Sequence, residues 1–151
     1  MPQPELPLSG SCRCGAVTIE ITAAPIMTAA CHCRGCQKMS ASAFSVTALI
    51  PTGGFRVTAG TPVKGGAKGT QLDHMCCPAC FTWMFTRIHG VSEFVNVRPT
   101  MFDDAEWAAP FIETVTKEKL SWAVTPARHS YEGFPPPAEY PALLAEYAAR
   151  G

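Results

Sequence analysis

The sequence predicts a mainly β protein of short antiparallel strands, and two observations support this. Six segments are rich in Val, Ile, Phe, Trp or Thr, as strands are, at residues 16–21, 43–50, 55–58, 82–88, 94–97 and 111–116. Glycine and proline turn signals separate them, at residues 51–54, 60–62, 65–66, 69, 90 and 99. Short strands between frequent breaks are typical of an antiparallel all-β body.

The first strand and one helix have the clearest patterns. Within 16–21, Val17, Ile19 and Ile21 alternate with polar residues, as in a half-buried strand. Residues 142–149 are good helix formers, Pro141 suits a first helical position, and Gly151 follows the segment. We therefore expect a helix near the C-terminus.

The length of 151 residues fits one domain that buries roughly 70% of its unfolded surface. We find no repeat and no linker, so residues 10–151 are predicted to form a single domain. Residues 1–9, which contain three prolines, are expected to be a flexible N-terminal segment.

Charge and hydropathy exclude several classes of function. Twelve Lys and Arg balance twelve Asp and Glu, which disfavours binding to nucleic acid or an anionic membrane surface. No run of about eighteen apolar residues exists to span a bilayer. Residues 1–10 contain Glu5 and no basic residue, unlike a secretory signal, so we expect a cytoplasmic protein. In that reducing compartment, eight cysteines favour metal ligands or reactive thiols over disulfides.

Two pairs of cysteines have the spacing of a structural zinc site. Zinc in such a site binds four ligands in a tetrahedron, and short spacings let one turn supply two sulfurs. One pair is two residues apart on an extended segment, and the other has the CxxC spacing: Cys12 with Cys14, and Cys77 with Cys80. A redox dithiol is the alternative for the CxxC pair, but the strand-then-helix context of a thioredoxin motif is missing.

The central cluster, Cys31, Cys33 and Cys36, supplies three ligands, the number typical of a catalytic zinc with one open position. His32 lies between two of these cysteines and is expected to point away from them, packed or hydrogen-bonded elsewhere. Cys76 is left over: it is either a small buried side chain or the fourth ligand of the central site, which would close that site.

Charge arithmetic narrows the chemistry of the central site. Three thiolates and Zn²⁺ sum to minus one, which favours binding a soft substrate thiolate over activating water. Arg34 and Lys38 flank the cluster and are candidates for offsetting the substrate's charge, with an ordinary surface role as the alternative.

The three clusters, in this order and spacing, resemble the glutathione-dependent formaldehyde-activating enzyme (Gfa, or CENP-V/GFA domain) family, over residues from about 10 to 122. The resemblance implies an Mss4-like, or β-tent, fold with two zinc ions per chain. By the same analogy the first and third clusters hold the structural zinc, and Cys31, Cys33 and Cys36 hold the catalytic one. The family's founding reaction adds the thiol of glutathione to formaldehyde, giving S-(hydroxymethyl)glutathione, and is a carbon-sulfur lyase reaction in reverse.

The sequence departs from the family pattern at two places. Phe81 and Thr82 replace a usual Gly-Ser pair, and Ala41 replaces a common glycine. Glycine often marks a close approach of the backbone, so these side chains are expected to narrow a ligand site.

The sequence therefore predicts a zinc-dependent carbon-sulfur lyase that acts on a small-aldehyde adduct of glutathione or another thiol. Asp73, His74 and Glu93 titrate near β-like segments, but none is assigned as a general base. The alternatives are a non-catalytic binding module stabilised by zinc and, less favoured, a redox protein of the methionine sulfoxide reductase type that would use Cys76.

Overall fold

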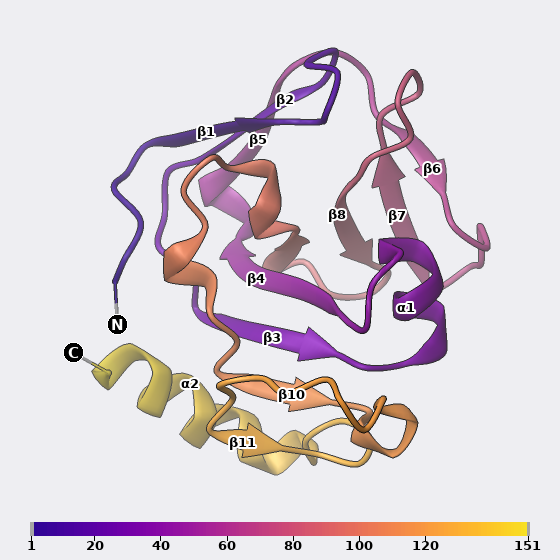
Figure 1. The fold of residues 1–151 in the computed structure, drawn as a ribbon. Helices are drawn as coiled ribbons and strands as arrows, with labels where there is room; N and C mark the ends of the chain where they lie inside the picture. The colour runs from indigo at the N-terminus through magenta and orange to yellow at the C-terminus, as the bar shows by residue number, and fades with distance from the viewer. Residues whose placement is uncertain (1, 151) are drawn as a thin grey trace.

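Short strands form most of the regular structure in the computed structural model, which describes residues 2–150 (Figure 1). Eleven strands are present: β1 Leu8–Ser11, β2 Thr18–Ile21, β3 Met27–Cys31, β4 Ser45–Pro51, β5 Phe55–Ala59, β6 Val63–Gly65, β7 Leu72–Cys76, β8 Trp83–Ile88, β9 Phe94–Val97, β10 Ile112–Thr114 and β11 His129–Ser130. The α-helices are α1 Arg34–Ser40 and α2 Tyr140–Ala149. Single 3₁₀ turns span Thr52–Gly54, Pro99–Met101, Glu106–Ala108, Thr116–Glu118 and Pro137–Glu139. The mainly β fold and the C-terminal helix are confirmed.

A three-stranded antiparallel sheet has the order β1-β2-β5. In β2 the alternation predicted from the sequence is observed, because Ile19 and Ile21 are fully buried while Thr18 and Glu20 are half-buried. β1 begins at Leu8, so the last two residues of the segment expected to be flexible pair with β2. This pairing places Cys12 directly after a sheet strand.

The larger sheet has eight strands in the order β11-β10-β3-β4-β9-β8-β7-β6. Most of its neighbours are antiparallel, but β10 runs parallel to both β3 and β11, so the expectation of a wholly antiparallel body was wrong at this end. The physical reason is that β10 returns after a long connection, as parallel neighbours must. Its pairing sets Thr114 beside Cys31, at the start of the central cysteine cluster.

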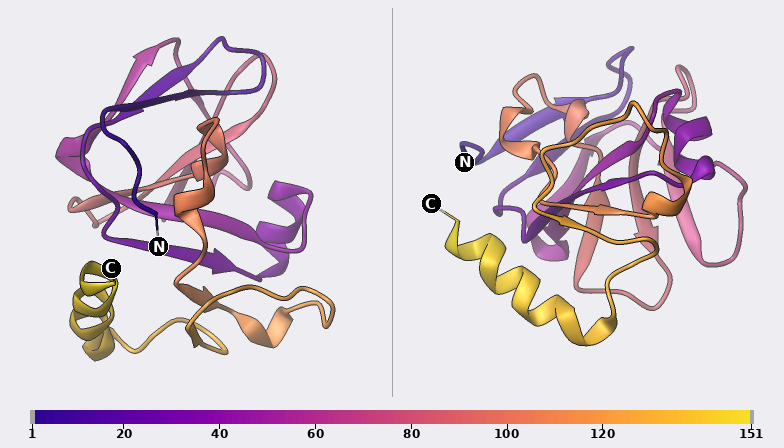
Figure 2. Two further views of the ribbon diagram at one scale, coloured as in Figure 1. Left: turned by 60° about the vertical axis from the view of Figure 1, so that its left-hand side comes forward. Right: turned by 60° about the horizontal axis from the view of Figure 1, so that its bottom comes forward.

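Two apolar clusters lie on opposite faces of β4. Ala48 and Ile50 belong to the main core, beneath the β1-β2-β5 sheet, whereas Leu49 belongs to a second cluster with Leu143 and Tyr147 of α2. Alternate residues of a strand point to opposite faces, so β4 contributes to both. The small sheet and α2 accordingly lie on either side of β3 and β4 (Figures 1 and 2).

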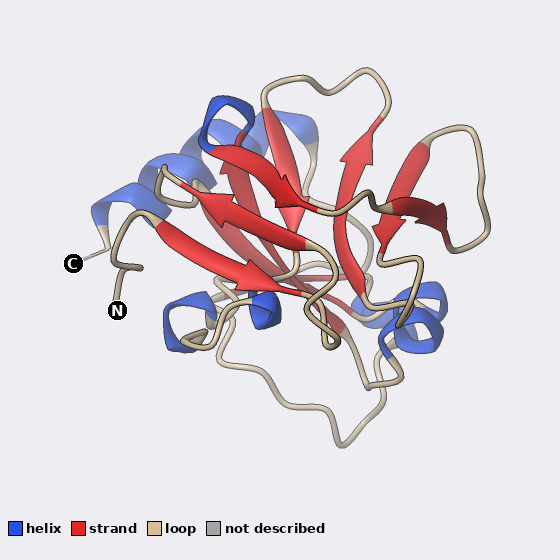
Figure 3. Ribbon diagram, turned by 90° about the horizontal axis from the view of Figure 1, so that it is seen from above, coloured by secondary structure: helices blue, strands red, loops and turns tan. Residues whose placement is uncertain are grey.

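The structure also contains elements that the sequence patterns did not predict. α1 begins directly after Cys33 and includes Cys36 of the central cluster. β3 ends at Cys31, and β7 ends directly before Cys77. Seen from above, the strands fill the centre and the helical segments lie around the periphery (Figure 3). Within residues 2–150, no helix has the length and apolar character needed to cross a membrane.

Candidate metal centres

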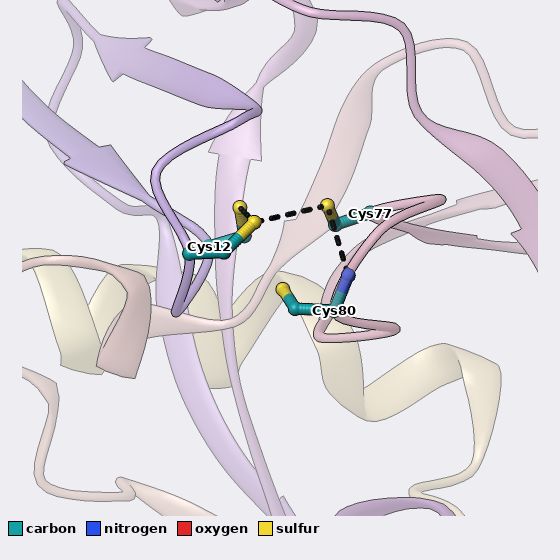
Figure 4. Close-up of side chains that lie close together, drawn as sticks. Cys12, Cys77 and Cys80 are labelled. Carbon is teal, nitrogen blue, oxygen red and sulfur yellow. Dashed lines mark hydrogen bonds between the residues drawn. The ribbon is translucent and has the colours of Figure 1, made fainter.

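Four cysteine sulfurs from two distant segments converge on one point, each within 4.8 Å of the others: Cys12, Cys14, Cys77 and Cys80. The first two follow β1 and the last two follow β7. Figure 4 shows the side chains of Cys12, Cys77 and Cys80 gathered at one place. The Sγ atom of Cys14 lies 3.7 Å from the Sγ atoms of both Cys12 and Cys77. A tetrahedron with zinc-sulfur bonds of about 2.3 Å has sulfur-sulfur edges of about 3.8 Å, so the four donors fit zinc.

Backbone amides surround these sulfurs, as a thiolate site requires. The Val17 amide donates to Cys12 Sγ at 3.3 Å, and the amides of Ala79 and Cys80 point to Cys77 Sγ at 3.4 and 3.5 Å. A hydrogen bond from the Thr82 hydroxyl lowers the pKa of Cys80 to about 5. Hydrogen bonds to the charged form favour it, so the contacts with Thr82 stabilise the thiolate form of Cys80, whereas the pKa of Cys14 is raised to about 11.

The second group consists of Cys31, Cys33 and Cys36, whose sulfurs also lie within 4.8 Å of one another. Cys31 ends β3, and Cys33 caps α1, its sulfur accepting the Cys36 amide at 3.2 Å. A hydrogen bond from the Cys36 thiol lowers the pKa of Cys31 to about 5. Among residues 2–150, no further Cys, His, Asp or Glu donor joins this group. Both clusters can hold a metal ion, and the second offers it three protein ligands.

His32 points away from the central sulfurs, as predicted. Its side chain is completely buried, and its Nε2 atom lies 2.9 Å from Oε2 of Glu113 on β10. Three more side chains donate to the Glu113 carboxylate: Lys119, Thr125 and Ser130. Burial opposes ionisation of this carboxyl group, but the hydrogen bonds outweigh it and lower the pKa of Glu113 to about 2. The network fixes the central cluster to the C-terminal part of the chain.

A cavity of about 440 Å³ is lined by residues that adjoin each of the two cysteine clusters. Ser45 lines it, and the Ser45 hydroxyl hydrogen-bonds to Cys36 of the central group. Thr82 lines it as well and contacts Cys80 of the first group at 3.0 Å. Apolar walls come from Met39, Phe44, Phe81 and Trp83, of which the sequence analysis related Phe81 alone to a ligand site.

The cation buried at this cavity is Arg98, which the sequence analysis missed. Arg34 and Lys38, the residues proposed to offset substrate charge, both have exposed side chains on α1. Arg98 is 9% exposed, and burial lowers its pKa to about 10, while the Coulombic interaction with Cys36 and Cys31 opposes that shift. No motif marks Arg98: it follows an ordinary apolar strand, β9, and only the folded chain brings it to the cavity.

The remaining candidates lie apart from both groups. Cys76 is buried at the end of β7, its Sγ atom faces the His74 carbonyl oxygen at 3.8 Å, and burial raises the pKa of its thiol. It is neither a fourth ligand nor an activated nucleophile in this structure.

The titratable residues that were not assigned as a general base have other partners. Asp73 pairs with Lys64 and His89, and Glu93 lies in a turn next to β9. His74 bonds the Thr86 hydroxyl, and burial lowers its pKa.

The chain matches the family model of the glutathione-dependent formaldehyde-activating enzymes over residues 7–118, more than half of its length. It belongs to this family. Among solved structures, a crystal structure of a Rhodobacter sphaeroides protein aligns with a TM-score of 0.49 and 21% identity, covering 64% of this chain and 88% of that one. The family match spans both cysteine groups, and residues 119–150, including α2, lie beyond it.

Both departures from the GFA pattern occur at left-handed backbone positions. Ala41, at the C-terminal cap of α1, has φ of 50°, and Phe81 has φ of 60°. L-residues other than glycine rarely adopt this conformation, so the backbone keeps a geometry suited to glycine although the side chains have changed. The Phe81 ring is 75% exposed at the edge of the cavity, where the predicted narrowing would occur.

Proposed function

We propose that this protein is a zinc-dependent carbon-sulfur lyase of the GFA family, acting on an adduct of glutathione or another thiol with a small aldehyde, such as S-(hydroxymethyl)glutathione. The observation that carries this is the central group of three cysteines, which has no fourth Cys, His, Asp or Glu donor among residues 2–150 and adjoins a cavity through Ser45. A metal bound there keeps a position for substrate.

In this proposal Cys31, Cys33 and Cys36 hold the catalytic zinc, and the four cysteines of the other group hold a structural zinc. When bound, the central zinc would supply a soft, positively charged position that favours the thiolate form of the substrate sulfur. Three thiolates leave this centre with a charge of minus one, which makes activation of water its less favourable task.

The cavity orients the adduct beside the cysteine group. In the lyase direction the carbon-sulfur bond of the hydroxymethyl adduct breaks, and its electron pair stays on sulfur. The adduct's hydroxyl group gives its proton to solvent as the aldehyde carbonyl forms, and the released thiolate takes up a proton from solvent, so the products are a thiol and an aldehyde. Holding the reacting groups in one geometry is a contribution worth several kcal/mol in intramolecular reactions.

The proposal includes a reducing compartment, such as the cytoplasm, because the ligands must remain thiols or thiolates. All eight cysteines are free and no disulfide joins them. The partner is then a small-molecule thiol or its adduct.

Metal analysis and thiol titration test the proposal together. We expect two zinc ions per chain, saturable glutathione binding, and release of formaldehyde from S-(hydroxymethyl)glutathione. Cys33→Ser should abolish thiol binding and turnover while the fold is retained, because the structural group is untouched. Cys76→Ser is the matched control and should keep both, since Cys76 belongs to neither group. Absence of thiol binding in the zinc-loaded wild type would instead favour a non-catalytic binding module.

A further inference from the structure

Arg98 combines burial, a positive charge and an incomplete set of partners. It follows β9, and its guanidinium stacks on the ring of Trp83 with its carbon 3.8 Å from the ring centroid. The Nη1 atom donates to the Val46 carbonyl at 3.0 Å. The Nε atom is buried and has no hydrogen-bond partner among residues 2–150.

No carboxylate compensates this charge within the described part of the chain. The ion pairs of residues 2–150 involve other cations, and none includes Arg98. Burial lowers the pKa of Arg98 to about 10, which leaves the side chain charged at neutral pH. A buried charge without a partner is costly, so its retention needs a compensating anion.

The charge of Arg98 lies in the same cavity as Ser45, a residue that contacts the central cysteine group. Arg98 lines the 440 Å³ cavity together with Ser45, which touches Cys36, and Thr82, which touches Cys80. A ligand in the cavity therefore meets the guanidinium of Arg98 beside Ser45, the residue through which the cavity adjoins the central cysteine group. The planar donors of arginine match a carboxylate in particular.

We propose that Arg98 is the anion-recognition residue of this cavity, and that the substrate thiol carries a carboxylate which binds to its guanidinium. Met39, Phe44 and Phe81 supply apolar contacts for the uncharged part of the same molecule. This inference rests on the proposed function, because it requires a thiol to bind at the central cysteine group.

A competing role for Arg98 is electrostatic support of the cysteine group alone. Burial lowers the pKa of Arg98, and the Coulombic interaction with Cys36 and Cys31 opposes this shift, so a role as their counterion would also account for its burial. The two roles differ in what they predict for ligands, because a pure counterion does not distinguish a carboxylate on the ligand from a neutral group of the same shape.

The test is calorimetric titration of the zinc-loaded wild type with glutathione and with its diamide, in which both carboxylates are carboxamides. We expect glutathione to bind about tenfold or more tightly than the diamide, as charge-assisted hydrogen bonds require. Equal affinities would overturn the inference and leave the proposed function standing. If neither thiol binds, the proposed function and the inference both fail.

Variants locate the preference on Arg98. Arg98→Met should reduce the ratio of the two affinities to about one, and Arg98→Lys should retain part of it, because lysine keeps the charge but not the two-pronged donor. Arg87→Met is the matched control: Arg87 also packs on aromatic rings, those of Phe55 and Phe85, but is exposed and does not line the cavity. If Arg98→Met keeps its zinc and still prefers glutathione over the diamide as strongly as the wild type does, the inference is overturned. If Arg98→Met does not fold, the ratio of the glutathione and diamide affinities in the wild type and in Arg98→Lys still tests the inference. In either case, Arg87→Met must show the same ratio as the wild type.

Discussion

His32 and Glu113 lie 81 residues apart in the sequence, yet their side chains meet at 2.9 Å in the interior, 0% and 7% exposed. The contact turns the imidazole ring away from Cys31 and Cys33 and toward β10. The Gln37 side chain amide donates to the His32 carbonyl at 2.8 Å and to that of Glu118 at 3.1 Å, which joins the same two regions a second time. The central metal group is thus positioned by residues at the far end of the family match.

Replacing Glu113 by glutamine should destabilise the protein by about 3 kcal/mol at neutral pH. This follows because folding lowers the pKa of Glu113 from 4.5 to about 2, and the glutamine cannot carry the charge that the fold stabilises. A carboxyl group whose folded pKa is depressed contributes stability above its unfolded pKa and loses it as pH falls toward the folded value. The difference between Glu113→Gln and wild type should therefore be constant above about pH 5 and shrink below about pH 4.5. Urea unfolding at matched zinc concentration measures it.

Glu146→Gln is the control for this prediction, because Glu146 also pairs with a histidine, His129, at 2.8 Å. That pair is exposed, with side chains 34% and 44% accessible, and should contribute less than about 1 kcal/mol. Equal effects of the two glutamine substitutions would contradict the role given to the buried network.

Cys77→Ser should remove one zinc and most of the stability of the domain. Structural zinc contributes roughly 10 to 16 kcal/mol in small zinc-binding peptides, comparable with the roughly 5 to 15 kcal/mol that holds a domain folded. Cys76→Ala changes the adjacent residue, which ligates no metal, and should cost only about 1 kcal/mol. Zinc content and thermal unfolding of the two variants give the answer, and a folded Cys77→Ser with two zinc ions would refute the assignment.

Phe81→Gly should leave stability nearly unchanged or raise it by less than about 1 kcal/mol, although it removes a whole aromatic ring. The ring is 75% exposed, so little burial is lost, and the left-handed conformation at φ of 60° no longer carries a Cβ atom. Lys68→Gly, at φ of 53° on an exposed loop, should behave in the same way. A loss above about 2 kcal/mol in Phe81→Gly, measured by denaturant unfolding, would mean that the ring packs more tightly than its exposure indicates.

Leu143→Ala should cost about 3 kcal/mol, because Leu143 is 5% exposed in the apolar cluster that joins α2 to β3 and β4. Leu144→Ala, on the half-buried side of the same helix, should cost about 1 kcal/mol. Chemical denaturation of both variants checks whether the segment beyond the family match is part of the cooperative fold. If the two leucines had equal and small effects, α2 would be an independent appendage.

The sequence predicted most of the elements that have an alternating or strongly β-like pattern. Strands expected at 43–50, 55–58, 82–88, 94–97 and 111–116 correspond to β4, β5, β8, β9 and β10, and the helix at 142–149 to α2. β3 was missed because Met27–Cys31 is buried at its first four positions and rich in alanine, with Thr28 as its single β-branched residue, so it shows no alternation. α1 was missed because it is only seven residues long and begins at an unusual cap, the Cys33 sulfur.

The cysteine groups were predictable because ligand spacing is local, and the structure brings together the sets expected from the motifs. Arg98 and Glu113 were not, because their roles come from pairings across 52 and 81 residues, with Val46 and His32. Neither residue has a sequence neighbour that marks it, and burial of a charged group is decided by the tertiary fold.

Anomalous diffraction at the zinc edge from crystals of freshly purified protein tests the central claim most directly. We predict two peaks per chain, one inside four cysteine sulfurs and one beside Cys31, Cys33 and Cys36 with a fourth ligand that is a solvent molecule or an added thiol. A single peak at the first group, or a protein side chain in the fourth place of the second, would contradict the account.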